Sequence, residues 1–169
     1  MRDRSTGLPV WLGLAGLLIV FDQLSKYWVQ ANFHFGERVE ITSFFNLVLV
    51  YNPGAAFSFL ADAGGWQKWF FVIFALVISA WLVHMLRQHV NSNEASERLL
   101  PLALTLVLGG ALGNVIDRLR FGAVVDFLDF HAAGWHWPAF NVADSAISIG
   151  VVLLLWQQLT HKDSAGSPR

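Results

Sequence analysis

The sequence predicts an all-α membrane protein with four transmembrane helices and a small β-rich element at the membrane interface between the first two. Only 14% of the 169 residues are charged and 55% are hydrophobic, whereas soluble domains carry about 25% charged residues. A membrane-spanning helix needs roughly 20 largely apolar residues. Four segments approach that length: 8–28, 66–86, 99–116 and 140–159. We therefore expect residues 1–169 to form a single integral membrane domain.

The first apolar segment begins like a secretory signal, because Arg2 and Arg4 precede an apolar run that extends to Phe21. No small-residue cleavage site follows that run. Instead, Tyr27 and Trp28 stand where aromatic side chains meet the membrane interface. We interpret the segment as a retained membrane helix.

The segment 32–60 is rich in β-branched and aromatic residues, in particular over 37–42 and 45–51. The sequence Asn52-Pro53-Gly54 that follows is a strong turn signal. We expect a small sheet-like element at the membrane interface, followed by Ala55-Ala56-Phe57. It could cover a substrate as a cradle or serve only as an interfacial anchor.

The remaining connections are expected to be short and polar at one end of the bundle and interfacial at the other. Pro101 fits the first turn of the third helix, where its missing N–H costs nothing. Residues 121–139 include Trp135 and Trp137, which are typical of an interface.

Four crossings place both termini on one side of the membrane, with six basic residues on that side against five on the other. This weak bias favours cytoplasmic termini.

Several functional classes are excluded or disfavoured. The chain has no cysteine, which removes thiol nucleophiles and thiolate metal sites. Its histidines fall in no His-Glu-x-x-His pattern. A net charge of −1 without basic clusters makes nucleic acid an unsuitable partner. Ser25 and Lys26 are adjacent on a helix and do not face each other, which disfavours a serine–lysine peptidase.

Four acidic residues are expected to approach one face of the membrane, because they lie near helix ends that alternate in direction. They are Asp22, Asp117, Asp126 and Asp144. Ionisable groups at membrane depth are costly, and they mark functional sites by default. A small proton-coupled carrier is the main alternative, although its acids should follow a path through the bilayer.

The four acids differ in their neighbours. Asp22 and Lys26 are spaced to pair on one helix face. Asp117 shares a face with Asn114 and Arg118, so we expect a cation or an amide to neutralise it. Asp126 and Asp144 have no adjacent cation. Spacing alone leaves two interpretations open for them: separate structural acids, or a pair that shares one proton and activates a water.

Four groups of segments together resemble the bacterial lipoprotein signal peptidase (signal peptidase II) family. They are Asp22-Gln23-Leu24-Ser25-Lys26; Asn52-Pro53-Gly54-Ala55-Ala56-Phe57; Gly109-Gly110-Ala111-Leu112-Gly113-Asn114-Val115-Ile116-Asp117-Arg118; and Val124-Val125-Asp126-Phe127 with Asn141-Val142-Ala143-Asp144. They occur in the family's order and cover most of the chain, which makes the set specific although each segment alone is weak. Pro53 falls at a position that the family's pattern leaves open.

The resemblance implies an aspartic endopeptidase of the bacterial inner membrane. It would remove the signal peptide from diacylglyceryl-modified prolipoproteins, before the lipid-bearing cysteine. Asp126 and Asp144 would be the catalytic dyad. The implied substrate-binding residues are Asn52, Asn114, Arg118 and Asn141. The implied supporting residues are Asp22, Lys26, Asp117 and Gly54. No metal or cofactor is implied, and membrane lipids and the prolipoprotein are the expected partners of a monomer.

Overall fold

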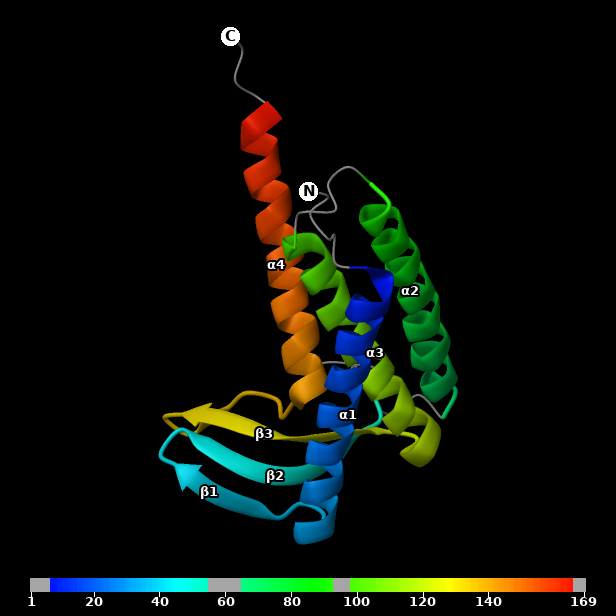
Figure 1. Cartoon of the computed structure of the whole chain (residues 1–169). Helices are drawn as coiled ribbons and strands as arrows, with labels where there is room; N and C mark the ends of the chain where they lie inside the picture. The colour runs from blue at the N-terminus through cyan, green and yellow to red at the C-terminus, as the bar shows by residue number, and fades with distance from the viewer. Residues whose placement is uncertain (1–6, 55–64, 93–97, 166–169) are drawn as a thin grey trace.

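The computed structural model describes residues 7–54, 65–92 and 98–165, with side chains up to Thr160. The expected segment Ala55-Ala56-Phe57 and the rest of the cradle to residue 60 lie outside these ranges. The elements follow one another as α1 (Leu8–Asn32), β1 (Arg38–Thr42), β2 (Phe45–Asn52), α2 (Gln67–Val90), α3 (Leu99–Phe121), β3 (Val124–Ala132), β4 (Trp135–His136) and α4 (Val142–Ala165). The strands lie across one end of the helical bundle, opposite the start of α1 and the end of α4 (Figure 1).

All four helices are long and apolar enough to cross a membrane, which confirms the predicted architecture. All four extend beyond the ends of the apolar segments expected from the sequence, to Asn32, Val90, Phe121 and Ala165. Hydropathy detects only the apolar part of a helix, whereas the backbone hydrogen bonds continue into polar residues at the interface. The end of α3 is fixed by Gly122, whose φ of 78° is left-handed and whose N–H donates to the Arg118 carbonyl.

The helix α3 lies at the centre of the bundle, where small residues allow its neighbours to approach. A Cβ added at Gly109 would lie 3.1 Å from the Ala15 carbonyl oxygen of α1, and one added at Gly110 would collide with the Ala143 carbonyl of α4. Close backbone approach of this kind is typical of small residues in membrane helices.

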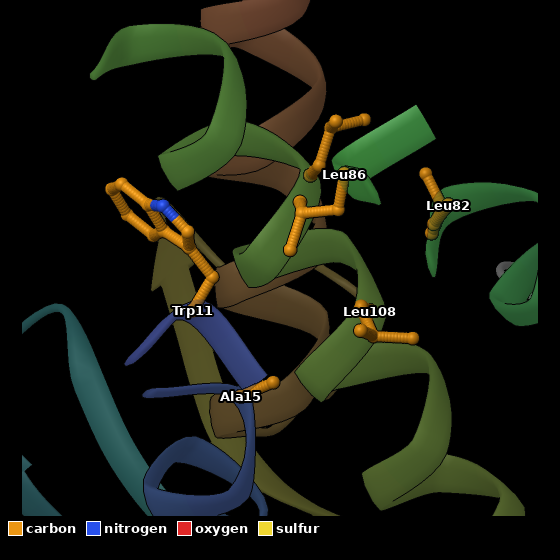
Figure 2. Close-up of a cluster of buried hydrophobic side chains, with 6 residues drawn as sticks. Trp11, Ala15, Leu82, Leu86 and Leu108 are labelled. Carbon is orange, nitrogen blue, oxygen red and sulfur yellow. The ribbon is translucent and has the colours of Figure 1, made fainter. Parts of the chain in front are cut away.

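A hydrophobic cluster packs α1, α2 and α3 together at the end of the bundle away from the sheet. Trp11 and Ala15 of α1 meet Leu82 and Leu86 of α2 over Leu108 of α3 (Figure 2). These side chains are almost fully buried. This cluster therefore stabilises the bundle far from the polar groups described below.

The sheet is larger than the sequence predicted, because it combines two separate connections. Strands β1 and β2 come from the expected segment after α1, whereas β3 and β4 come from the connection between α3 and α4. The strand order is β1-β2-β3-β4, with antiparallel pairing. In this register Val50 lies opposite Asp126, and Asn52 lies opposite Val124. The end of β2 is thereby placed beside the start of β3.

Candidate active site

Asp126 and Asp144 line the same cavity, which has a volume of about 850 Å³. Asp126 lies on β3 and Asp144 in the first turn of α4. The predicted residues Asn52, Gly54, Asn114 and Arg118 also line this cavity. The cavity continues along α4 past Ile147 to Ile149, so it extends from the two carboxyl groups along an apolar, membrane-spanning helix.

Each of the two carboxyl groups accepts hydrogen bonds from asparagine amides. Asn141 Nδ2 donates to Asp126 Oδ1 at 2.7 Å, and Asn52 Nδ2 donates to Asp126 Oδ2 at 3.2 Å. Asn114 Nδ2 donates to Asp144 Oδ1 at 2.7 Å. Three of the four predicted substrate-binding residues therefore contact the aspartates directly.

The orientation of each amide is fixed by a group on its other side that can only donate. The Asn114 oxygen accepts from the Lys26 ammonium at 3.0 Å. The Asn141 oxygen accepts from the Asp144 backbone N–H at 2.9 Å, and the Asn52 oxygen accepts from the Gly54 N–H at 3.0 Å. A flipped amide would set its NH₂ against a donor, so all three NH₂ groups must point at the carboxyl groups.

The Asp126 carboxyl is poised to hold a proton near neutral pH. Burial, followed by the charge of Asp144, raises the pKa of Asp126 to about 7, although hydrogen bonds from Asn52 and Asn141 act against this shift. Two neighbouring carboxyl groups in a low-dielectric site share one proton, since both cannot ionise readily. The arrangement can therefore supply a general base and a general acid together.

Arg118 occupies a different place from the one that the spacing suggested. Its guanidinium donates to the Gly54 carbonyl at 3.1 Å and lies 5.1 Å from the centre of the Phe71 ring. Its Nε is buried without a hydrogen-bond partner in the described part of the chain. Adjacent helix positions point about 100° apart, so Arg118 faces the cavity while Asp117 faces away from it.

The cation beside Asp117 is Lys26 rather than Arg118. Lys26 Nζ lies 2.8 Å from Asp22 Oδ2, as the i,i+4 spacing predicted, and 2.7 Å from Asp117 Oδ2. All three side chains are at most 2% exposed. We refer to Asp22, Lys26 and Asp117 as the ion triad.

The sequence interpretation overlooked two groups of polar residues. Gln23 donates to Asp117 Oδ1 at 2.8 Å and so completes the surroundings of the ion triad. On the sheet, Asp129 accepts from Asn46 at 2.8 Å and lies 2.9 Å from His136 Nδ1. The Gln23–Asp117 contact joins helices α1 and α3, and the Asn46–Asp129 contact joins strands β2 and β3, which are far apart in the sequence. Only the proximity of Gln23 to Asp22 and Lys26 gave a signal in the sequence.

Burial acts to raise the pKa of Asp129, but its partners offset that effect. Hydrogen bonds from Asn46 and His136 and the charge of Arg38, 3.3 Å away, hold this pKa below its ordinary value. Asp129 therefore resembles an ionised structural acid, unlike Asp126 on the same strand. Within the described ranges, no group of three or more His, Asp or Glu side chains is arranged to hold a metal ion.

This chain is similar to known proteins along nearly all of its length. A family model described as signal peptidase (SPase) II matches residues 14–160. A lipoprotein signal peptidase of Azoarcus sp. (strain BH72) is 55% identical over 171 residues, which cover 99% of this chain and 94% of the relative. One of Paraburkholderia phytofirmans is 55% identical over 152 residues, which cover 90% of this chain and 86% of the relative.

Solved structures extend the similarity to the fold. One, described as a bacterial membrane enzyme, superposes with a TM-score of 0.81 at 31% identity, over 95% of this chain and 94% of its own. Another with the same description has a TM-score of 0.75 at 33% identity, over 89% and 93%. Sequence and fold thus agree along nearly the full length, and this chain belongs to the signal peptidase II family.

Proposed function

We propose that Asp126 and Asp144 are the catalytic dyad with which this chain removes the signal peptides of prolipoproteins. The reaction class follows from membership of the signal peptidase II family, whose members are aspartic peptidases. The observation that carries the assignment is that two carboxyl groups, a buried one on Asp126 and a partly buried one on Asp144, line one cavity and are each held by an amide donor. Asp22 and Asp117 instead both pair with the Lys26 ammonium group.

The dyad acts through one shared proton. The ionised carboxylate removes a proton from a water molecule, whose oxygen attacks the scissile carbonyl carbon. The protonated carboxyl donates its proton to the carbonyl oxygen, which gives a tetrahedral diol. The diol collapses as the C–N bond breaks: the carboxyl group that took the water proton gives it to the leaving amine, and the other carboxylate takes a proton from one diol hydroxyl, which restores the shared proton. The pKa of about 7 for Asp126 supports such sharing at neutral pH.

The residues around the dyad divide into two roles in this proposal. Arg118 lines the cavity, and its guanidinium group binds carbonyl groups of the substrate backbone. A buried donor without a hydrogen-bond partner is costly, so substrate carbonyl groups that accept from it favour binding. Asn52, Asn114 and Asn141 also match substrate-binding positions of the family, but their NH₂ groups donate to Asp126 and Asp144. We assign them to holding the dyad.

The substrate is proposed to be a diacylglyceryl-modified prolipoprotein, cut before its lipid-bearing cysteine. A substrate anchored by acyl chains must reach the dyad from within the bilayer. The cavity that runs along α4 from Asp144 to Ile149 supports such a lateral path.

The proposed location is the bacterial inner membrane, with cytoplasmic termini and the dyad towards the periplasmic face. The dyad and the sheet lie at the end of the bundle opposite the start of α1 (Figure 1). Signal-peptide cleavage sites of exported proteins lie at that face. The sheet would then rest at the periplasmic interface, as the sequence analysis expected.

The assignment is tested by incubating the purified protein with lipidated and unlipidated precursors, with and without a chelator. We expect cleavage of the lipidated precursor only, unaffected by the chelator. Asp126→Asn and Asp144→Asn should each abolish cleavage while the protein still inserts and folds. Normal processing by either variant would refute the dyad, and loss of cleavage on chelation would contradict a metal-free reaction.

A further inference from the structure

The two proposed catalytic aspartates lie on separate elements, and the ion triad contacts the backbone of both elements directly beside them. Asp22 Oδ1 accepts the N–H of Ala143 at 2.9 Å, and Ala143 immediately precedes Asp144. Asp117 Oδ2 accepts the N–H of Val125 at 3.2 Å, and Val125 immediately precedes Asp126. Asp22 therefore holds the backbone beside Asp144, and Asp117 holds the backbone beside Asp126.

The contact at Ala143 uses a general property of helix ends. The first N–H groups of a helix have no partner within the helix, and a carboxylate near them is favoured by the helix dipole. Asp22 supplies this carboxylate to α4 from the neighbouring helix α1. The position of the first turn of α4, where Asp144 lies, is thereby tied to α1.

Lys26 fixes the two acids relative to each other and to the dyad. An ammonium group has three donors, and here they meet three acceptors: Asp22 Oδ2 at 2.8 Å, Asp117 Oδ2 at 2.7 Å and Asn114 Oδ1 at 3.0 Å. Through Asn114, Lys26 also acts on Asp144. Because the group is almost fully buried, its direction is set by these contacts rather than by solvent.

We propose that the ion triad is a positioning device that sets the spacing of the two catalytic aspartates, in addition to stabilising the bundle. This inference rests on the proposed function, in which both aspartates must reach one water and one carbonyl group. Misplacement of a catalytic group by about 1 Å can reduce a rate by about 100-fold. The triad acts through backbone N–H groups next to the dyad, so its loss should reduce kcat more than substrate binding.

The charges of the triad show which variants can test this role. Removing Lys26 would leave two buried carboxylates uncompensated, which threatens folding. Removing one acid leaves a balanced pair of one cation and one anion. Asp117→Ala and Asp22→Ala are therefore the informative deletions, each of which releases one of the two backbone contacts.

Asp117→Asn is the conservative counterpart of Asp117→Ala. Its amide oxygen can still accept from Lys26 and from the Val125 N–H, and only the acceptor for Gln23 is lost. We expect Asp117→Asn to keep kcat within about three-fold and Asp117→Ala to lose roughly 10–100-fold, with KM changed far less. The measurement is steady-state cleavage of one lipidated precursor by purified, folded variants. Asp22→Ala is the second deletion, used also where Asp117→Ala fails to fold.

Leu86→Ala supplies a control for loss of stability alone. Leu86 is fully buried in the cluster of Figure 2, at the end of the bundle away from the dyad. Its truncation should lower Tm while leaving kcat intact below the transition. If a triad deletion lowers kcat no more than Leu86→Ala does at a similar loss of Tm, the positioning role is refuted.

Two further results would also overturn the inference. Both can be distinguished from an incorrect assignment of the catalytic dyad. An equal loss of kcat in Asp117→Asn and Asp117→Ala would show that the charge, not the backbone contact, is required. A deletion that raises KM with kcat unchanged would place the triad in substrate binding. Failure of the proposed function would appear separately, as cleavage by Asp126→Asn or Asp144→Asn. A folded but inactive Asp117→Asn together with an active Asp126→Asn would identify Asp117 as the catalytic partner.

Discussion

Asp126 lies on a strand rather than on a membrane helix, and this position gives it an unusual titration. It is 2% exposed, and among the described residues the donors to its carboxyl group are the amides of Asn52 and Asn141. Burial and the charge of Asp144 raise its pKa to about 7. The ordinary pKa of an aspartate is about 3.9, so the folded protein binds this proton more tightly than the unfolded chain does.

This shift predicts a pH dependence of stability. Between about pH 4 and pH 7 the folded state holds more protons than the unfolded state, so stability falls as pH rises through this window. A full shift of three units corresponds to at most about 4 kcal/mol. We expect the wild-type Tm in detergent to fall from pH 5 to pH 8, and to fall less in Asp126→Asn. Equal pH profiles for the two proteins would contradict the raised pKa.

Individual residues were predictable from the sequence where one helix holds both partners. The Asp22–Lys26 pair follows from its i,i+4 spacing alone. The Lys26–Asp117 pair joins two helices, and the sequence suggested Arg118 as the nearest cation instead. Asp129 escaped notice because its partners lie on other strands. Local spacing thus identifies a residue's own helix face, but not which helix or strand that face meets.

At the scale of elements, close contact between α3 and α4 places Asp144 at the cavity. A Cβ at Gly110 would collide with the Ala143 carbonyl and would lie 2.7 Å from Ile147 Cγ1. Because a backbone carbonyl cannot turn aside, the two helices would have to separate. Ala143 precedes Asp144, so such a separation would displace the dyad.

We therefore expect Gly110→Ala to reduce both stability and activity. Overpacking costs roughly 1–3 kcal/mol, which exceeds the gain of about 1 kcal/mol from the higher helix propensity of alanine. Gly16→Ala is the matched control, because no atom lies within 4 Å of its added Cβ. The measurements are the Tm and the rate of precursor cleavage of both variants. A Gly110→Ala protein as active and stable as Gly16→Ala would show that the helices can move apart freely.

The helices were predictable and half of the sheet was not. A span of about 20 apolar residues has few alternatives in a bilayer, because its backbone must satisfy its own hydrogen bonds. Strand β3 lacks an alternating pattern, since its first four residues are all buried. Its partner β2 lies about 80 residues earlier in the chain, and no local signal specifies such a pairing. From composition, residues 121–139 could be predicted only to lie at the membrane interface, and not to form a strand.

At the scale of the whole molecule, the arrangement of the elements gives the protein two chemically different ends. The sheet, the dyad and the ion triad lie towards one end, and the end of α2 and the start of α3 lie at the other (Figure 1). The proposed function requires the first end to face the periplasm, where signal peptides of exported precursors emerge. The basic residues alone favour this orientation only weakly, so it calls for a direct measurement.

The absence of cysteine from the chain makes this orientation straightforward to measure. Ser43→Cys would place a single thiol in the exposed turn between β1 and β2, and Gln88→Cys would place one at the exposed end of α2. We expect a membrane-impermeant thiol reagent to label Ser43→Cys in intact spheroplasts, and Gln88→Cys only after the membrane is permeabilised. Both variants lie outside the dyad and the ion triad, so retained cleavage of a lipidated precursor verifies that the labelled protein is native. The reverse pattern would place the dyad on the cytoplasmic side, away from the signal peptides that it is proposed to cut.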